Sequence, residues 1–117
     1  MAQNFHNLEV YQNAYSLSVD IYKALQDIRG EFRLKDQITG AASSIGANLA
    51  EMGSMDNKNQ QRQKVITCLG EANELEHWLN YSREIGLITE SDTQTFLERL
   101  ITIRKQLFGL MKAIERG

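Results

Sequence analysis

Apolar side chains recur every three or four positions in four segments of this sequence, which is the spacing of one face of an α-helix. No segment shows the strict alternation of apolar and polar residues that predicts a β-strand. The predicted helices span Leu8–Arg29, Leu34–Met52, Asn59–Ile85 and a fourth segment that begins near Thr89. Four helices joined by short links pack most simply as an all-α, antiparallel up-down four-helix bundle.

Glycine and capping residues indicate where these helices begin and end. Gly30 and Gly86 should stop the first and third helices, and Gly53 is expected to form a left-handed cap after the second. The fourth helix should be capped by the side chain of Thr89. Between the second and third helices, the polar and amide-rich segment 54–64 predicts a longer, mobile loop.

The first and fourth predicted helices each carry two apolar rows. In the first, the rows are Val10, Ala14, Leu17, Ile21, Ala24 and Ile28, and Leu8, Tyr11, Tyr15, Tyr22 and Leu25. In the fourth, they are Phe96, Leu100, Ile103, Leu107, Leu110 and Ile114, and Leu97, Ile101, Phe108 and Met111. One row of each helix can face the bundle core. The second row needs another cover, which an interface between copies of the chain would supply.

The segment Gln37–Gly53 is unusual because most of its side chains are small. A polar row lies beside its apolar row, and it consists of Gln37, Ala41, Ser44, Asn48 and Glu51. A further row has almost no side chain, and it consists of Thr39, Ser43, Gly46, Ala50 and Gly53. Such a helix lets neighbouring helices or subunits approach closely. Glu51 and Glu74 could approach each other across the bundle, where a hydrogen-bonded structural network is favoured over acid–base chemistry.

Composition adds bounds on size and compartment. The 117 residues are most consistent with a single domain, 1–117, and the complete lack of proline fits a mostly helical chain. The single cysteine, Cys68, is expected to be a core residue. With no leader-like opening and no long apolar run, we expect a cytoplasmic protein without membrane association. A net charge of −2 gives no global signal for nucleic acid.

Catalytic and metal motifs are incomplete. Glu74 and His77 match the Glu-x-x-His pattern of di-iron bundles, but the chain has only two histidines and lacks the second such motif. His77 is therefore expected to be a solvated side chain. No nucleophile elbow and no phosphate-binding glycine loop is present. We accordingly expect no cofactor, no metal and no enzymatic activity.

Charge is unevenly distributed along the chain. From Val65 to Asp92 there are six acids against Arg83 alone, whereas five basic residues and two acids follow Asp92. A short basic run precedes the acidic stretch. The candidate nucleic-acid-binding residues are Lys58, Arg62, Lys64, Arg104, Lys105 and Lys112. In a ring of identical subunits such a patch is repeated, which multiplies its field. The alternative is an ordinary solvated face.

The pattern Gln-x3-Ala-x2-Ser-Ile-x2-Asn-Leu-Ala-Glu in the second helix resembles the 23S rRNA intervening-sequence proteins. The motif residues are Gln37, Ala41, Ser44, Ile45, Asn48, Leu49, Ala50 and Glu51. The opening segment 5–14 and the segment 70–76, which includes Glu74, are also similar to that family. The resemblance implies an antiparallel four-helix bundle assembled as a homopentamer. A related bundle is the accessory protein of diversity-generating retroelements, a pentameric barrel that binds nucleic acid and a reverse transcriptase.

Some positions depart from the family pattern. Thr39 and Gly40 stand where the family usually has two basic residues, and Glu71 stands where a serine is expected. Two hypotheses follow. The first is a non-enzymatic oligomeric scaffold that binds RNA, DNA or a nucleic-acid enzyme such as a reverse transcriptase through its basic residues. The alternative is a protein–protein interaction module without nucleic-acid binding, which uses the tyrosine row of the first helix or the amide-rich loop.

Overall fold

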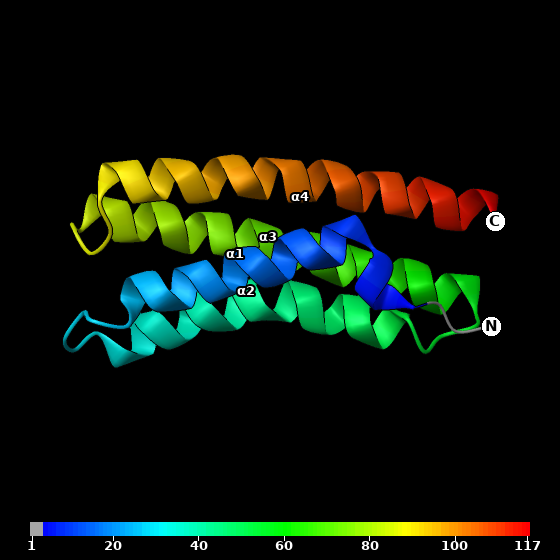
Figure 1. Cartoon of the computed structure of the whole chain (residues 1–117), viewed down its shortest axis with the longest axis horizontal. Coiled ribbons are helices and arrows are strands. Elements are labelled where there is room, and N and C mark those ends of the chain that lie inside the picture. Colours follow the sequence, from blue (N-terminus) through cyan, green and yellow to red (C-terminus); the bar gives the residue numbers. More distant parts are fainter. Residues whose placement is uncertain (1–3) are drawn as a thin grey trace.

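The structure, a computed structural model, describes residues 4–117 and within that range contains four long α-helices and no strand. A short 3₁₀ helix, η1 (Phe5–Asn7), precedes α1 (Glu9–Leu25), α2 (Phe32–Met52), α3 (Lys58–Glu84) and α4 (Glu90–Arg116). Successive helices run in opposite directions along a rod of 45 × 21 × 20 Å (Figure 1). The predicted all-α, antiparallel four-helix bundle is confirmed.

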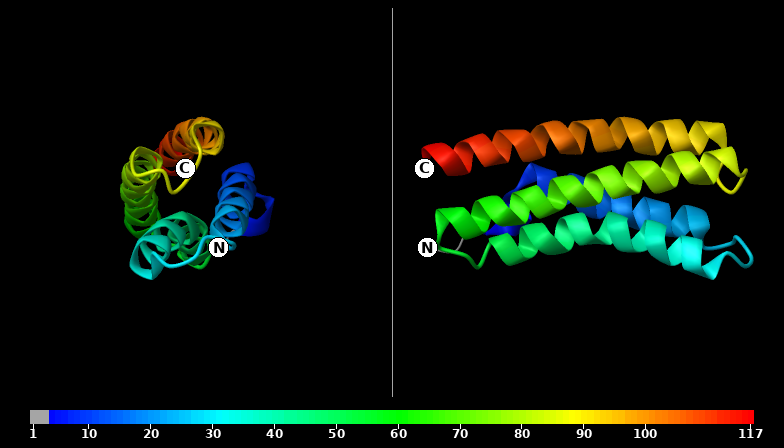
Figure 2. Two further views of the ribbon diagram at one scale, coloured as in Figure 1. Left: turned by 90° about the vertical axis from the view of Figure 1, so that its left-hand side faces the viewer. Right: turned by 180° about the vertical axis from the view of Figure 1, so that it is seen from behind.

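Each helix packs against two neighbours, in the cyclic order α1, α2, α3, α4 and back to α1. The view along the bundle shows the four helices around a common centre (Figure 2). That centre is filled by the inward-facing row of each helix, represented by Leu17, Leu49, Leu75 and Leu107, each at most 1% exposed. The core therefore uses one apolar row of α4, as predicted, whereas on α1 it also includes Leu25 of the second row, which is 2% exposed.

α1 ends at Leu25, earlier than the predicted Arg29. The Gln26 N–H bonds the Lys23 carbonyl and the Ile28 N–H bonds the Leu25 carbonyl, so the last turn tightens and the helix stops. Ile28 still packs against the core, but from the connecting segment. The prediction was wrong because a core residue at helical spacing does not have to lie in the helix.

Gly53 does not form the predicted left-handed cap. Its φ of −59° is right-handed, and its N–H bonds the carbonyls of Leu49 and Ala50, each at 3.2 Å. The chain continues through another right-handed turn, in which the Met55 N–H bonds the Met52 carbonyl at 3.0 Å. The carbonyls at the end of α2 are thus satisfied by this turn, and no reversal to positive φ is needed.

The predicted loop 54–64 is mostly helical, because α3 already begins at Lys58. Asn57 caps α3 by accepting hydrogen bonds from the Asn59 and Gln60 N–H groups, at 2.8 and 3.1 Å. At the other end of α3, Gly86 has a φ of 77°, the left-handed conformation that glycine adopts without strain, and it ends the helix as predicted.

Candidate interaction surfaces

The second apolar rows of α1 and α4 are only partly covered: Leu25 is buried in the core, whereas other members remain exposed. On α1, Tyr15 and Tyr22 are each 59% exposed; on α4, Ile101 and Phe108 are 48% and 52% exposed. Within residues 4–117 the chain does not cover them. Large apolar side chains grouped at helical spacing on an outer face are typical of a contact with another protein surface.

Arg104 interrupts the outer row of α4. Its guanidinium donates a hydrogen bond to the Glu76 carboxylate on α3, and both side chains are partly exposed. Its Nε is buried and has no partner in the part of the chain that the structure describes. The positive charge of Arg104 is therefore neutralised by Glu76 of the same chain. The aliphatic part of its side chain extends the apolar row between Ile101 and Phe108.

Lys58 and Arg62 lie beside the C-terminal end of α4. Lys58 Nζ donates to the Glu115 carbonyl at 3.3 Å, and Arg62 Nε is 3.6 Å from a Glu115 carboxylate oxygen. A third candidate, Lys64, lies on the other side of α3, where its Nζ is 2.5 Å from the Glu51 carboxylate of α2. The basic run of the sequence is thus divided between two faces and balanced by acids.

Lys105 and Lys112 complete the candidate set. Both are exposed on the outer face of α4, and no ion pair or hydrogen bond engages either ammonium in residues 4–117. The structure thus distributes the six candidate residues over several surfaces instead of gathering them into one patch. Sequence reasoning did not find the partners Glu76 and Glu115, because pairing across antiparallel helices depends on which residues share a level of the bundle.

The polar motif row of α2 faces α3. Gln37 lines a groove with α3 side chains, Ala41 is buried, and Glu51 pairs with Lys64. Asn48 Nδ2 donates to the Ser44 carbonyl at 2.8 Å, so its bond stays within its own helix. Asn48 and Glu51 thus make their polar contacts within the chain, and a structural role for the two residues stays a prediction.

Glu51 and Glu74 do not approach each other, contrary to expectation. Glu51 lies beside Lys64, and Glu74 lies ten positions further along α3, about 15 Å away. The Glu74 carboxylate instead accepts a hydrogen bond from Trp78 Nε1 at 3.4 Å. In an antiparallel pair, residues meet only at matching levels, and these two glutamates are at different levels.

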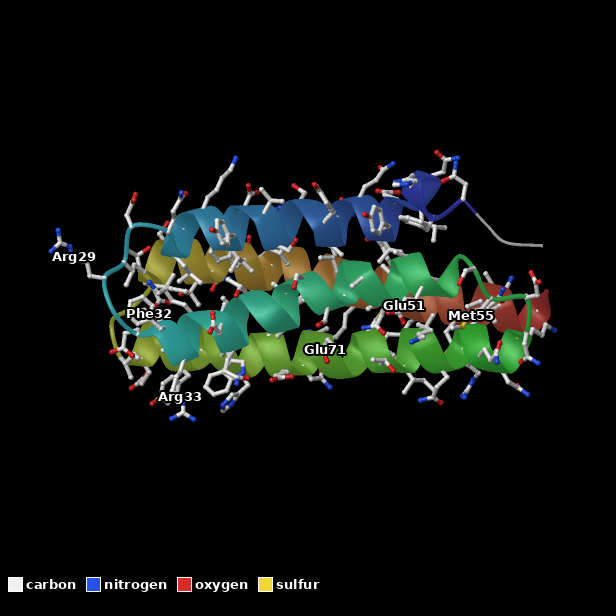
Figure 3. All side chains as sticks on the ribbon, turned by 90° about the horizontal axis from the view of Figure 1, so that it is seen from below. Arg29, Phe32, Arg33, Glu51, Met55 and Glu71 are labelled. Atoms are coloured by element: carbon white, nitrogen blue, oxygen red, sulfur yellow. The ribbon has the colours of Figure 1, made fainter. Side chains whose placement is uncertain are left out.

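Glu71 lies along the junction of α2 and α3, as does Glu51 (Figure 3). It is half-buried and has no hydrogen bond or ion pair among the residues that the structure describes. Burial raises the pKa of the Glu71 carboxyl, and the neighbouring charge of Glu74 raises it further. The junction of α2 and α3 thus carries an unmatched carboxylate where the family pattern has a serine.

A groove of about 570 Å³ continues this junction towards the start of α2. Its apolar lining comes from Leu34, Trp78, Tyr81 and Ile85, the last two being 47% and 50% exposed. Trp78 and Tyr81 contact each other edge to face, with ring centroids 5.8 Å apart. Trp78, Tyr81 and Ile85 follow one another at helical spacing on α3, so they lie on one side of that helix.

The small-residue row of α2 faces α1. Gly46 lies under the Tyr11 ring, where an added Cβ would be 3.6 Å from the nearest ring carbon. Further along, Tyr22, Thr39 and Ser43 line an open groove of about 690 Å³ between α1 and α2. Close helix approach is therefore achieved at Gly46 and not along the whole row.

Cys68 is fully buried, as expected, and its thiol donates to the Ile45 carbonyl at 3.5 Å. Burial raises its pKa to about 12, with a further contribution from Glu71. His77 is exposed and contacts the rings of Trp78 and Tyr81. No group of three or more histidine, cysteine or acidic residues in residues 4–117 is arranged to hold a metal ion.

None of the helices in residues 4–117 combines the length and the hydropathy that a bilayer crossing requires.

Residues 6–109 match the family model described as 23S rRNA-intervening sequence protein. Among solved structures, the chain is similar to a protein of unknown function from the S23 ribosomal protein family of Bacteroides thetaiotaomicron. The two share 29% identity and a TM-score of 0.81 over 88% of this chain and 98% of the other. A search of curated proteins gives no match.

Proposed function

Because the chain belongs to the 23S rRNA-intervening sequence protein family, we propose that it is a non-enzymatic scaffold assembled from several copies of itself. The observation that carries this proposal is the outer row of α4, where Ile101 and Phe108 remain about half exposed although the core is complete. Full burial of an exposed side chain of this size contributes about 1.5–3 kcal/mol, so covering the exposed half of each would contribute about half of that amount. The resemblance to a pentameric family makes a homopentamer the expected assembly.

The test is to place charge on the outer row of α4. The double variant Ile101→Asp/Phe108→Asp should lower the sedimentation coefficient towards that of a single chain, because charged groups would have to be desolvated in the contact. The matched control is Thr95→Asp/Thr102→Asp, which adds the same charge at exposed positions outside the row. Equal behaviour of the two double variants in sedimentation velocity would contradict the proposal.

A second candidate function is the binding of a different protein through α1. The favouring observation is the open groove beside Tyr22, together with the exposed ring of Tyr15. Tyrosine rings supply large contact areas at interfaces and are enriched among residues that dominate binding energy. A pull-down after nuclease treatment should recover a protein with the natural chain and lose it with Tyr15→Ala/Tyr22→Ala. If the natural chain and the double variant recover the same protein, the tyrosine row of α1 is not the contact surface.

Nucleic-acid binding stays a prediction, and the geometry supports it less. Arg62, Lys64 and Arg104 each contact an acid, and Lys58 contacts a backbone carbonyl. A cation that is already paired contributes less to counterion release from a phosphate backbone. The remaining free cations of the candidate set are Lys105 and Lys112.

A further inference from the structure

Two unmatched charges of opposite sign lie on different faces of the bundle. Glu71, half-buried between α2 and α3, has no cation beside it, and Lys105 on the outer face of α4 has no acid beside it in the described residues. Each shares a helix face with apolar side chains that are wholly or partly exposed. Glu71 precedes Trp78 and Tyr81 on one row of α3, and Lys105 follows Ile101 on α4.

The ion pairs inside the chain give the relative levels of α3 and α4. Arg104 lies opposite Glu76, and Arg62 lies opposite Glu115. Since the two helices run antiparallel, moving forward on α4 corresponds to moving backward on α3 (Figure 1).

The level of each residue follows by counting from these pairs. Lys105 is within about one turn of the level of Glu71 and Glu74, and Ile101 is at about the level of Trp78. Lys105 is therefore at about the height of the carboxylates of Glu71 and Glu74, and Ile101 is at about the height of Trp78. Phe108, one turn beyond Lys105, falls near the level of Glu71.

Residues at the same height on the two surfaces can meet when copies are related by rotation about an axis parallel to the bundle. Such a rotation preserves height, and it places α4 of one copy antiparallel to α3 of the next. Arg104 of the outer row pairs with Glu76 of α3, so this row lies on the α3–α4 side of the bundle. Seen along the bundle, that side adjoins the α2–α3 side (Figure 2). Contacts between two sides that meet at roughly a right angle close into a ring after about four or five copies.

We propose that the outer row of α4 in one copy docks on the α2–α3 junction of the next copy, with Lys105 against Glu71 and Glu74 and with Ile101 against Trp78. This inference rests on the proposed self-assembly and names the two surfaces that meet. The occupant is a second copy of this chain, because one chain carries both complementary surfaces at matching levels. The contact is heterologous, so every copy offers one surface and receives the other.

The local chemistry of the junction agrees with this docking. The groove of about 570 Å³ next to Trp78 can receive the side chain of Ile101. An ammonium from the next copy would supply the cation that Glu71 lacks and would oppose the effect of Glu74 on its pKa. Both surfaces would lose exposed apolar area in the same step.

The test is a charge swap across the contact, read as mass in solution by light scattering. Glu71→Lys alone and Lys105→Glu alone should each shift the mass towards that of a single chain, because each places like charges together. The combined variant Glu71→Lys/Lys105→Glu should restore the multimer. The matched control, Lys112→Glu, reverses an equally free lysine about two turns further along α4 and should leave the mass unchanged.

Helical circular dichroism verifies that each variant folds. If Glu71→Lys fails to fold, Glu71→Gln/Glu74→Gln takes its place and should weaken the multimer. A natural chain that is a single copy would overturn both the proposed self-assembly and this contact. A natural multimer that neither single reversal changes, or that the double reversal fails to restore, would overturn this contact alone.

Discussion

At the scale of the residue, Gly46 shows how side-chain size is matched to helix packing. Glycine inside a helix is less stable than alanine by about 1 kcal/mol. The Tyr11 ring lies 3.6 Å from an added Cβ, which is ordinary van der Waals contact, but larger side chains would meet the ring. Gly40, on the same helix, has no atom within 4 Å of an added Cβ.

A large side chain should therefore destabilise the protein at Gly46 but not at Gly40. Gly46→Leu should lower the free energy of unfolding by about 1–3 kcal/mol, because the side chain overpacks the contact with α1. The control Gly40→Leu should be neutral or stabilising. Urea unfolding of both variants tests the contrast, and equal losses would show that Gly46 is not confined by Tyr11.

A second prediction concerns the reactivity of Cys68. Burial raises its pKa to about 12, so the reactive thiolate is nearly absent in the folded chain and increases only as the pH approaches that value. Alkylation at about pH 8 should be very slow in the folded protein and fast in urea. Mass spectrometry of the alkylated fraction measures both rates, and comparable rates would contradict the buried placement.

At the scale of the element, the sequence predicted the helices better than their ends. Helix interiors follow from apolar periodicity, which depends only on spacing within one segment. The end of α1 and the conformation of Gly53 depend on tertiary packing, since Ile28 reaches the core from outside the helix and Gly53 continues a right-handed turn. The predicted Thr89 cap is confirmed, because a cap of this kind depends only on residues a few positions apart in the sequence.

The Thr89 cap carries its own prediction. Its hydroxyl oxygen accepts the Asp92 N–H at 3.1 Å, so Thr89→Ala should lower the free energy of unfolding by about 1 kcal/mol. Thr95→Ala is the control, because that threonine is exposed within α4 and alanine is the better helix former there. If thermal unfolding shows the same change for both, the capping bond does not contribute.

At the scale of the whole molecule, the candidate surface was only partly predictable. The composition of the basic and acidic stretches is visible in the sequence, but the pairing of Arg104 with Glu76 and of Arg62 with Glu115 joins distant segments. Counting basic residues along the chain therefore overstates the free positive charge on the surface, because some of these residues are neutralised by acids from other segments. The exposed side chains of the second rows, such as Tyr22 and Phe108, were predictable in contrast, since a helix cannot turn two wide apolar faces fully towards the core.

The charge pattern also predicts how any RNA binding should behave. Binding at low salt should weaken as salt rises, and Lys112→Glu should reduce it, because Lys112 is a free cation. Arg62→Gln is the comparison and should have a smaller effect, because Arg62 already pairs with Glu115. Fluorescence anisotropy across a salt series measures both variants. No binding at low salt, or equal effects of the two changes, would oppose a role for these residues.

The central claim is that copies of this chain assemble, and the absolute mass of the natural chain in solution tests it most directly. Multi-angle light scattering over a dilution series should give a multiple of the 13.4 kDa single chain, and the family resemblance predicts about five copies. Dilution should dissociate the assembly only at low concentration, because apolar rows and complementary charges hold it together. A mass of 13.4 kDa at every concentration would contradict the account.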